Sequence, residues 1–190
     1  MQNYGSKIIN LAGKGKNDEC YTMPYAIVPL LPYLEKFKGQ KIWCPFDTQE
    51  SEFVKILTAN GHDVIYSHIS LGMNFFEYEP EKWDLIVSNP PFTGKTKIFE
   101  RCINFNKPFA LIMSNSILND PAPMRLFKKS NIELLLFTDR MVFSNQKQIK
   151  RIPYACGYFC HGILPEKLKI EYLPPWRMKK EKKNETTKMD

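Results

Sequence analysis

Short apolar runs alternate along this chain with stretches suited to amphipathic helices, and this alternation constrains its fold more than any other feature. The runs expected to form strands are residues 41–44, 63–66, 83–88, 109–113 and 133–137. The segments between them that favour helix are residues 52–60, 96–105 and 121–129. Strands that alternate with helices are typical of a parallel sheet covered on both faces. Two later runs, residues 154–161 and 168–172, are expected to close the sheet as antiparallel strands.

The pattern predicts an α/β fold class, with a single doubly wound, mostly parallel sheet. The length of 190 residues fits one compact domain, which we place at residues 1–176. Residues 177–190 are expected to be a basic, disordered tail, because four lysines crowd them: Lys179, Lys180, Lys182 and Lys183. The formal net charge of +7 favours a polyanionic partner, although part of that charge belongs to the tail.

The cysteines and the apolar segments indicate a reduced compartment. The five cysteines contain no C-x-x-C pair and no disulfide framework, and they are Cys20, Cys44, Cys102, Cys156 and Cys160. No signal core and no membrane-spanning stretch is apparent, so we expect a cytoplasmic protein without a membrane partner. Cys156, Cys160 and His161 could suggest a metal, but the two thiols alternate onto one strand face without a second ligand pair. We therefore expect no metal site.

One motif carries the chemistry: the apolar run at residues 83–88 leads directly into Asn89, Pro90, Pro91 and Phe92. The prolines fix φ and remove backbone donors, and a residue before proline is held extended. The Asn89 amide oxygen and the Pro90 carbonyl are then expected to accept both N–H groups of an aromatic amine. Phe92 is expected to stack on the base. The alternative is an ordinary Pro-Pro loop that closes a strand.

An apolar strand followed by Asn-Pro-Pro-Phe resembles the S-adenosylmethionine-dependent amino-methyltransferases, in the form typical of their adenine-N6 branch. The resemblance implies a Rossmann-like methyltransferase fold, S-adenosyl-L-methionine as cofactor, and a catalytic role for residues 89–92. Glutamine-N5 and RNA adenine methyltransferases carry similar motifs. DNA is favoured over RNA, because the branch with this order of motifs is dominated by DNA enzymes, including small phage-borne ones.

Two elements that resemble the family's cofactor-binding segments come before this motif. Tyr21 and Thr22 resemble a Tyr-Thr-Pro element, with the proline moved to Pro24. The alternative is that Thr22 is the N-cap of a helix-like stretch over residues 24–37. Pro45 and Phe46 fit the family's Asp-Pro-Phe-x-Gly-x-Gly loop. There Cys44 takes the acidic position, and Thr48 and Glu50 replace the glycines.

The resemblance implies three further cofactor contacts. Asp47 or Glu50 is expected to meet the ammonium group of the cofactor. His68 follows the second strand, where the family binds the ribose hydroxyls, and the alternative is a histidine satisfied by its surroundings. Asn74, before Phe75, takes the position that reads the adenine amine of the cofactor.

Basic residues around a polar stretch are expected to contact nucleic acid. They are Arg140, Lys147, Lys150 and Arg151, and they surround residues 144–146. Such residues supply phosphate contacts that do not depend on base sequence. The alternative is a solvated hairpin. Asn115, Ser116 and Asn119 are expected to border the base pocket.

The sequence therefore predicts an enzyme that methylates the N6 amine of adenine in DNA. The alternatives are an RNA adenine or protein glutamine methyltransferase, or a non-catalytic relic that binds nucleic acid or a partner. The missing glycines motivate the relic. Because the chain is too short for a large recognition domain, a protein partner that supplies specificity is also considered.

Overall fold

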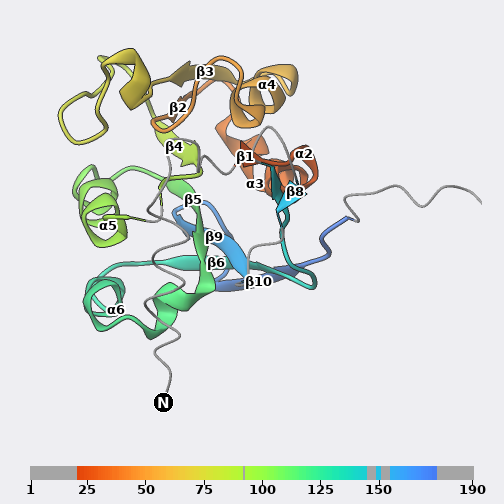
Figure 1. Cartoon of the computed structure of the whole chain (residues 1–190), viewed down its shortest axis with the longest axis vertical. Coiled ribbons are helices and arrows are strands. Elements are labelled where there is room, and N and C mark those ends of the chain that lie inside the picture. Colours follow the sequence, from red (N-terminus) through yellow and green to blue (C-terminus); the bar gives the residue numbers. More distant parts are fainter. Residues whose placement is uncertain (1–20, 92, 145–148, 151–154, 175–190) are drawn as a thin grey trace, which may run out of the picture.

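Seven strands form one mixed sheet in the order β10-β6-β9-β5-β4-β2-β3 (Figure 1). The computed structural model describes residues 21–91, 93–144, 149–150 and 155–174. The strands are β2 (Lys41–Cys44), β3 (Asp63–Tyr66), β4 (Leu85–Ser88), β5 (Phe109–Ser114), β6 (Glu133–Phe137), β9 (Cys156–His161) and β10 (Leu168–Glu171). The predicted α/β class with one doubly wound, mostly parallel sheet is confirmed. The expected tail, residues 177–190, lies outside the described residues.

Only β9 runs antiparallel to its neighbours in this sheet, β5 and β6. The expectation of an antiparallel last strand was wrong for β10, which pairs parallel to β6 with Leu168 opposite Leu134. The reason lies in the loop after β9. The buried carboxylate of Glu133, at the start of β6, accepts hydrogen bonds from the backbone N–H groups of residues 162, 163 and 164. The chain thus crosses the beginning of β6, and β10 can only run alongside it in the same direction.

A second, three-stranded sheet was not predicted. It consists of β1 (Tyr21–Thr22), β7 (Phe143–Ser144) and β8 (Ile149–Lys150), all antiparallel, in the order β1-β7-β8. A strand of two residues has no room for a repeating apolar pattern, so nothing in the sequence signals it. The small sheet joins the N-terminal part of the described chain to the segment just before β9.

Helices cover both faces of the large sheet (Figure 1). One face carries α2 (Pro24–Ile27), η1 (Val28–Leu30), α3 (Leu31–Leu34), η2 (Glu35–Phe37) and α4 (Glu52–Ala59). The other face carries α5 (Lys95–Asn104) and α6 (Pro121–Phe127). Alternate strand residues separate accordingly: Leu85 and Val87 pack toward α2–α4, whereas Ile86 packs toward α5 and α6.

The helix-like stretch over residues 24–37 is broken into four short helical pieces rather than one helix. Pro29 and Pro32 lie inside it, and each removes a backbone donor that a continuous α-helix needs. Two of the four pieces are consequently 3₁₀ turns. Elsewhere, the described part of the chain contains no helix with the length and apolarity required to cross a membrane.

Candidate active site

The order in which successive strands are placed in the sheet reverses at β2. After β2 the chain forms β3 on one side, then returns to form β4 on the other side of β2. The loops that leave the carboxyl ends of β2 and β4 therefore diverge. In open α/β sheets, ligands bind in the crevice at such a topological switch point. Asp47 lies three residues after Cys44, the last residue of β2, and Ser88 is the last residue of β4.

Asp47 and Ser88 meet at this switch point. Asp47 is 6% exposed, and the hydroxyl of the fully buried Ser88 donates a hydrogen bond to its Oδ2 atom. Burial raises the pKa of the Asp47 carboxyl to about 6, and hydrogen bonds from Ser88 and Ser51 oppose that rise. These opposing effects come from hydroxyls, and no described cation contributes to them. The switch point thus holds a buried acid that a nearby cation would stabilise in its ionised form.

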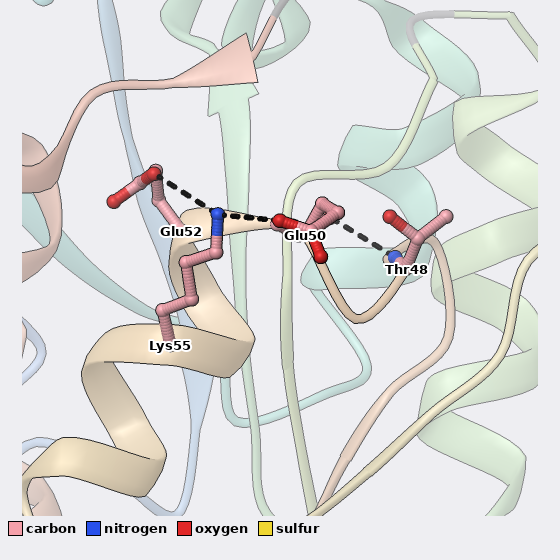
Figure 2. Close-up of polar contacts among 5 residues, drawn as sticks. Thr48, Glu50, Glu52 and Lys55 are labelled. Atoms are coloured by element: carbon pink, nitrogen blue, oxygen red, sulfur yellow. Dashed lines mark hydrogen bonds and ion pairs between the residues drawn. The ribbon is translucent and has the colours of Figure 1, made fainter.

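The loop after β2, which lacks the expected glycines, is closed by its own side chains. The Ser51 hydroxyl accepts a hydrogen bond from the Thr48 backbone N–H at 3.0 Å. The Lys55 ammonium group lies 3.0 Å from Glu50 and 3.9 Å from Glu52, and Figure 2 draws both ion pairs as dashed lines. Within the described residues, Asn106 is the only non-glycine residue with a positive φ. Thr48 and Glu50 therefore follow a path that needs no left-handed backbone.

This loop distinguishes the two acids expected to meet the ammonium group. Glu50 is exposed and paired with Lys55, whereas Asp47 is buried against Ser88. Of the two, only Asp47 faces the switch point. Pro45 is buried, and Phe46 is partly buried, so the start of the loop is anchored in the protein.

Ser67, which the sequence interpretation missed, ties the end of β3 to the same crevice. Its carbonyl accepts from the Asp47 N–H at 3.1 Å, and its hydroxyl accepts from the Trp43 indole N–H at 2.9 Å. Its place directly after β3 was the only signal. The next residue, His68, is half-buried and is the N-cap of η3 (Ile69–Leu71), where its Nδ1 accepts from the Ser70 N–H.

Asn74 and Phe75 lie beyond η3 and take different positions. Asn74 is half-buried, and its Oδ1 accepts from the Phe76 N–H at 3.2 Å. Phe75 is 3% exposed and packs in an aromatic cluster, with ring centroids 5.5 Å from Trp43 and 4.7 Å from Phe46. Phe75 therefore supports Phe46 from within the core and has little surface left for a ligand.

The proline motif follows β4 without interruption. Asn89 is half-buried, and its Oδ1 atom is shielded from solvent. Pro90 is buried and Pro91 exposed, and Phe92 lies outside the described residues. Because β4 neighbours β2, this motif leaves the sheet beside the loop that carries Asp47.

Asn115 follows β5, the other neighbour of β4, and begins η4 (Asn115–Asn119). Its Oδ1 is buried and has no hydrogen-bond partner among the residues that the structure describes. Its backbone N–H donates to Ala155 at 2.8 Å. A Cβ atom at Gly157 would come within 3.2 Å of this oxygen and 2.8 Å of the Leu135 carbonyl. The glycine therefore lets β9 approach β6 closely while leaving space for the Asn115 amide.

Thr22 supplies a second unsatisfied oxygen. Thr22 is buried, and its Oγ1 finds no hydrogen-bond partner within the described ranges. Met23, not Thr22, is the N-cap of α2, and no side chain caps that helix. The capping alternative is therefore wrong. Thr22 lies in β1, which packs next to α4, the helix that begins just after the Asp47 loop.

Of the four predicted nucleic-acid contacts, the structure describes Arg140 and Lys150. Arg140 is exposed shortly before β7, and Lys150 is in β8. Lys147 and Arg151 lie outside the described residues. β7 and β8, called the basic hairpin below, pair antiparallel, and β7 also pairs with β1; this pairing leaves both the nucleic-acid contact and the solvated hairpin open. Two predicted functional segments, residues 21–22 and the basic hairpin, thus belong to one sheet.

Metal ligation and disulfide bonding find no site in the described part of the chain. No group of three or more His, Cys, Asp or Glu side chains gathers there. Its cysteines are buried and form no disulfide, and burial raises the pKa of the Cys44 and Cys160 thiols well above their ordinary value.

No protein-family model matches the chain, and a comparison with curated proteins gives no match either. The chemistry of the crevice must therefore be inferred from its own residues.

Proposed function

We propose that this chain is an S-adenosylmethionine-dependent methyltransferase that acts on the N6 amine of adenine, with DNA as the favoured substrate. One observation carries the proposal: an Asn-Pro-Pro segment leaves β4 at the topological switch point, beside a loop with a buried carboxyl group. The switch point is where an α/β sheet binds ligands. The motif supplies acceptors for an amine, and Asp47 supplies a site for a cation.

The side chains of the crevice fit this cofactor by their chemistry. S-adenosylmethionine carries an ammonium and a sulfonium charge, and the Asp47 carboxyl is a buried acid without a described cation beside it. Its adenosine and methionine parts also offer donors. The Thr22 hydroxyl oxygen is a buried group whose hydrogen-bonding capacity is unused by the described residues. Phe46 and His68 are partly exposed on adjoining loops. Tyr21, Asn74 and Pro45 complete the proposed set.

The cofactor, when bound, supplies a methyl group activated by a positively charged sulfur. The protein's part is to hold and prepare the amine. The Asn89 side-chain oxygen and the Pro90 carbonyl accept hydrogen bonds from the two N–H groups of the amine. These bonds withdraw the nitrogen lone pair from conjugation with the ring and make the nitrogen nucleophilic. The nitrogen would gain the methyl group as the sulfur–methyl bond breaks, which leaves a neutral thioether, and the methylated amine would lose one proton to solvent. No covalent enzyme intermediate is needed, because proximity and orientation lower the barrier.

DNA is favoured because the proline motif resembles the adenine-N6 branch, and the basic hairpin suits a phosphate backbone. In duplex DNA the N6 amine is paired, so the adenine must flip out of the stack to reach Asn89. A reduced cytoplasm suits the described cysteines, which form no disulfide. A protein partner for sequence recognition remains part of the proposal, as does RNA as second substrate.

A second candidate function is supported by the loop after β2. Side chains close this loop, where glycines would let a backbone approach a ligand. A methyltransferase-fold protein that has lost its cofactor, and binds nucleic acid or a partner only, would tolerate such a loop. Calorimetric titration with S-adenosylmethionine separates the two: heat of binding supports the enzyme, and its absence at high protein concentration supports the non-catalytic protein.

Nucleoside analysis of an expressing host tests the proposal directly. DNA and RNA from cells that express wild type or Asn89→Ala are digested and measured for N6-methyladenine by mass spectrometry. We expect methylated DNA with wild type and background levels with Asn89→Ala. The matched control is Asn104→Ala, an exposed asparagine at the end of α5, which should methylate like wild type. Equal methylation by wild type and Asn89→Ala would remove Asn89 from the mechanism.

A further inference from the structure

Within the described residues, the outer edge of β10 has no partner strand, and exposed apolar side chains alternate along the strand. Among the described residues β10 pairs only with β6, which makes it an edge strand of the sheet (Figure 1). Leu168 is 48% exposed, and Ile170 and Tyr172 are each 64% exposed. Proteins usually blunt or cover an edge strand of this kind, because its free backbone groups pair readily with another chain.

The backbone groups on this edge belong to the same apolar residues. The carbonyls of Lys167 and Glu171 accept hydrogen bonds from β6, at 2.8 Å from the Leu134 nitrogen and 3.1 Å from the Thr138 nitrogen. Backbone groups of successive strand residues point to opposite sides. The N–H and C=O groups of Leu168 and Ile170 therefore point away from β6, toward the open edge.

The order of residues along β10 is complementary to itself when the strand is reversed. An antiparallel copy centred on Ile170 places Ile170 opposite Ile170, Leu168 opposite Tyr172, and Lys169 opposite Glu171. Opposite charges on directly facing residues stabilise an antiparallel pair, and a two-fold axis forms each such pair twice. Ile170 is also a residue whose backbone groups face outward, as this centre of pairing requires.

We propose that β10 is a dimer interface, at which a second copy of this chain adds its own β10 antiparallel and extends the sheet across a two-fold axis. The Lys169–Glu171 pattern favours this occupant, because a reversed copy of the same strand puts each charge opposite its counterpart. Each of these two side chains also has a polar partner within its own copy. Lys169 lies 3.2 Å from Glu166, and Glu171 accepts a hydrogen bond from the Tyr33 hydroxyl at 2.5 Å.

A neighbouring groove extends the apolar surface of this edge. Leu134, which pairs with Leu168, lines a cavity of about 760 Å³ next to α6, together with Leu118, Met124 and Ile132. Directly paired residues of neighbouring strands point to the same face of a sheet. Leu168 and the Tyr172 of the second copy would therefore continue the apolar wall that begins in this groove.

Charge reversal tests the proposed register. Sedimentation equilibrium of the full chain is measured for wild type, Lys169→Glu, Glu171→Lys and the double variant. We expect wild type to dimerise, and each single change to raise the dimer dissociation constant about tenfold or more, since two like-charged pairs replace two opposite ones. The double variant restores both pairs and should dimerise like wild type. Single variants that lost the dimer through misfolding would not regain it in this way.

A matched pair of substitutions tests the edge itself. Ile170→Lys should make the chain monomeric, whereas Ile69→Lys, an equally exposed isoleucine beyond the opposite edge strand, should leave the dimer unchanged. A wild-type chain that stays monomeric at its highest soluble concentration overturns the proposal. A dimer that survives Ile170→Lys, or charge reversals that leave it unaffected, overturn it as well.

Discussion

The Ser88 hydroxyl, at the end of β4, donates a hydrogen bond to the buried carboxylate of Asp47, 41 residues earlier in the chain. This bond spans the topological switch point and fixes the loop after β2 against the strand that carries the proline motif. It gives the Oδ2 atom of Asp47 a hydrogen-bond donor, while burial raises the pKa of the Asp47 carboxyl to about 6. The protonation state of this acid at the switch point should therefore change near pH 6.

Asp47 should make the stability of the protein fall between pH 4 and pH 6. The pKa of the folded carboxyl, about 6, lies above its ordinary value of 3.8, so its contribution is full below pH 4 and lost as the pH rises through 6. The difference corresponds to about 3 kcal/mol in the free energy of unfolding. Urea denaturation across this range should show the decline in wild type and not in Asp47→Asn. The same slope in both proteins would assign the pH dependence to other groups.

S-adenosylmethionine should bind with micromolar or weaker affinity, about −8 kcal/mol or less favourable. Asp47→Asn should weaken binding roughly 10- to 100-fold, because it removes a charge-assisted hydrogen bond. Binding to wild type should also weaken as the pH falls through about 6, where the carboxylate takes up a proton. Calorimetry checks both effects, with Glu50→Gln as the control on the exposed acid of the same loop. If Asp47→Asn and Glu50→Gln bind S-adenosylmethionine with the same affinity, Asp47 does not meet the cofactor.

Asn89→Ala should lower the rate of methyl transfer about 100- to 1,000-fold while leaving cofactor affinity unchanged. The side-chain oxygen is proposed to act on the amine in the transition state, and loss of one such contact costs about 2.7–4 kcal/mol by analogy with oxyanion-hole donors. Single-turnover kinetics on an adenine-containing oligonucleotide give the rate, and calorimetry gives the affinity. A loss of cofactor binding that accounts for the whole effect would contradict the role assigned to Asn89.

Much of the sheet could be predicted because apolar runs bounded by turn residues report strand positions directly. Residues 41–44, 63–66 and 133–137 match β2, β3 and β6 residue for residue. The direction of β10 could not be predicted, since it depends on a contact between Glu133 and a loop 29 to 31 residues away. The breaks in the first helical stretch were signalled by Pro29 and Pro32, which the prediction of one stretch over residues 24–37 did not weigh.

The candidate site was predictable in the order of its segments and not in the environment of each side chain. Asp47 or Glu50 was expected near the ammonium group of the cofactor, from their positions after a strand. The burial of Asp47 and its bond to Ser88 arise only when β2 and β4 become neighbours. Phe75 was expected beside the cofactor, but the aromatic rings of Trp43 and Phe46 draw it into the core. Sequence position gives the strand end at which a residue lies, and packing decides whether it faces solvent.

Asn115→Ala should weaken substrate binding without lowering the stability of the protein. A buried oxygen without a hydrogen-bond partner costs about 1–3 kcal/mol, so its removal should leave the free energy of unfolding unchanged or raise it by about 1 kcal/mol. If this oxygen meets the substrate, KM for the adenine substrate should rise about tenfold. Asn104→Ala, an exposed asparagine at the end of α5, is the control. A variant that is less stable yet kinetically normal would show a purely structural residue.

Gly157→Ala should destabilise the protein by about 1–3 kcal/mol. Its Cβ would lie 2.8 Å from the Leu135 carbonyl oxygen and 2.9 Å from a methyl group of Leu136, and the backbone oxygen cannot move without distorting β6. Thermal and urea denaturation measure the change. A variant as stable as wild type would mean that β9 and β6 can separate by a few tenths of an ångström at no cost.

The small sheet connects β1, which belongs to the proposed cofactor site, with the basic hairpin, which is proposed to bind nucleic acid. Thr22 pairs with Phe143 across β1 and β7, β7 pairs with β8, and the Val142 N–H donates to the Tyr25 hydroxyl at 2.6 Å. A ligand that shifts β1 must therefore shift the basic hairpin too. Thermodynamic reciprocity then applies: the factor by which a bound cofactor changes the affinity for nucleic acid equals the factor by which nucleic acid changes the affinity for the cofactor. The two ligands would then sense each other through three short strands as well as at the atoms that react.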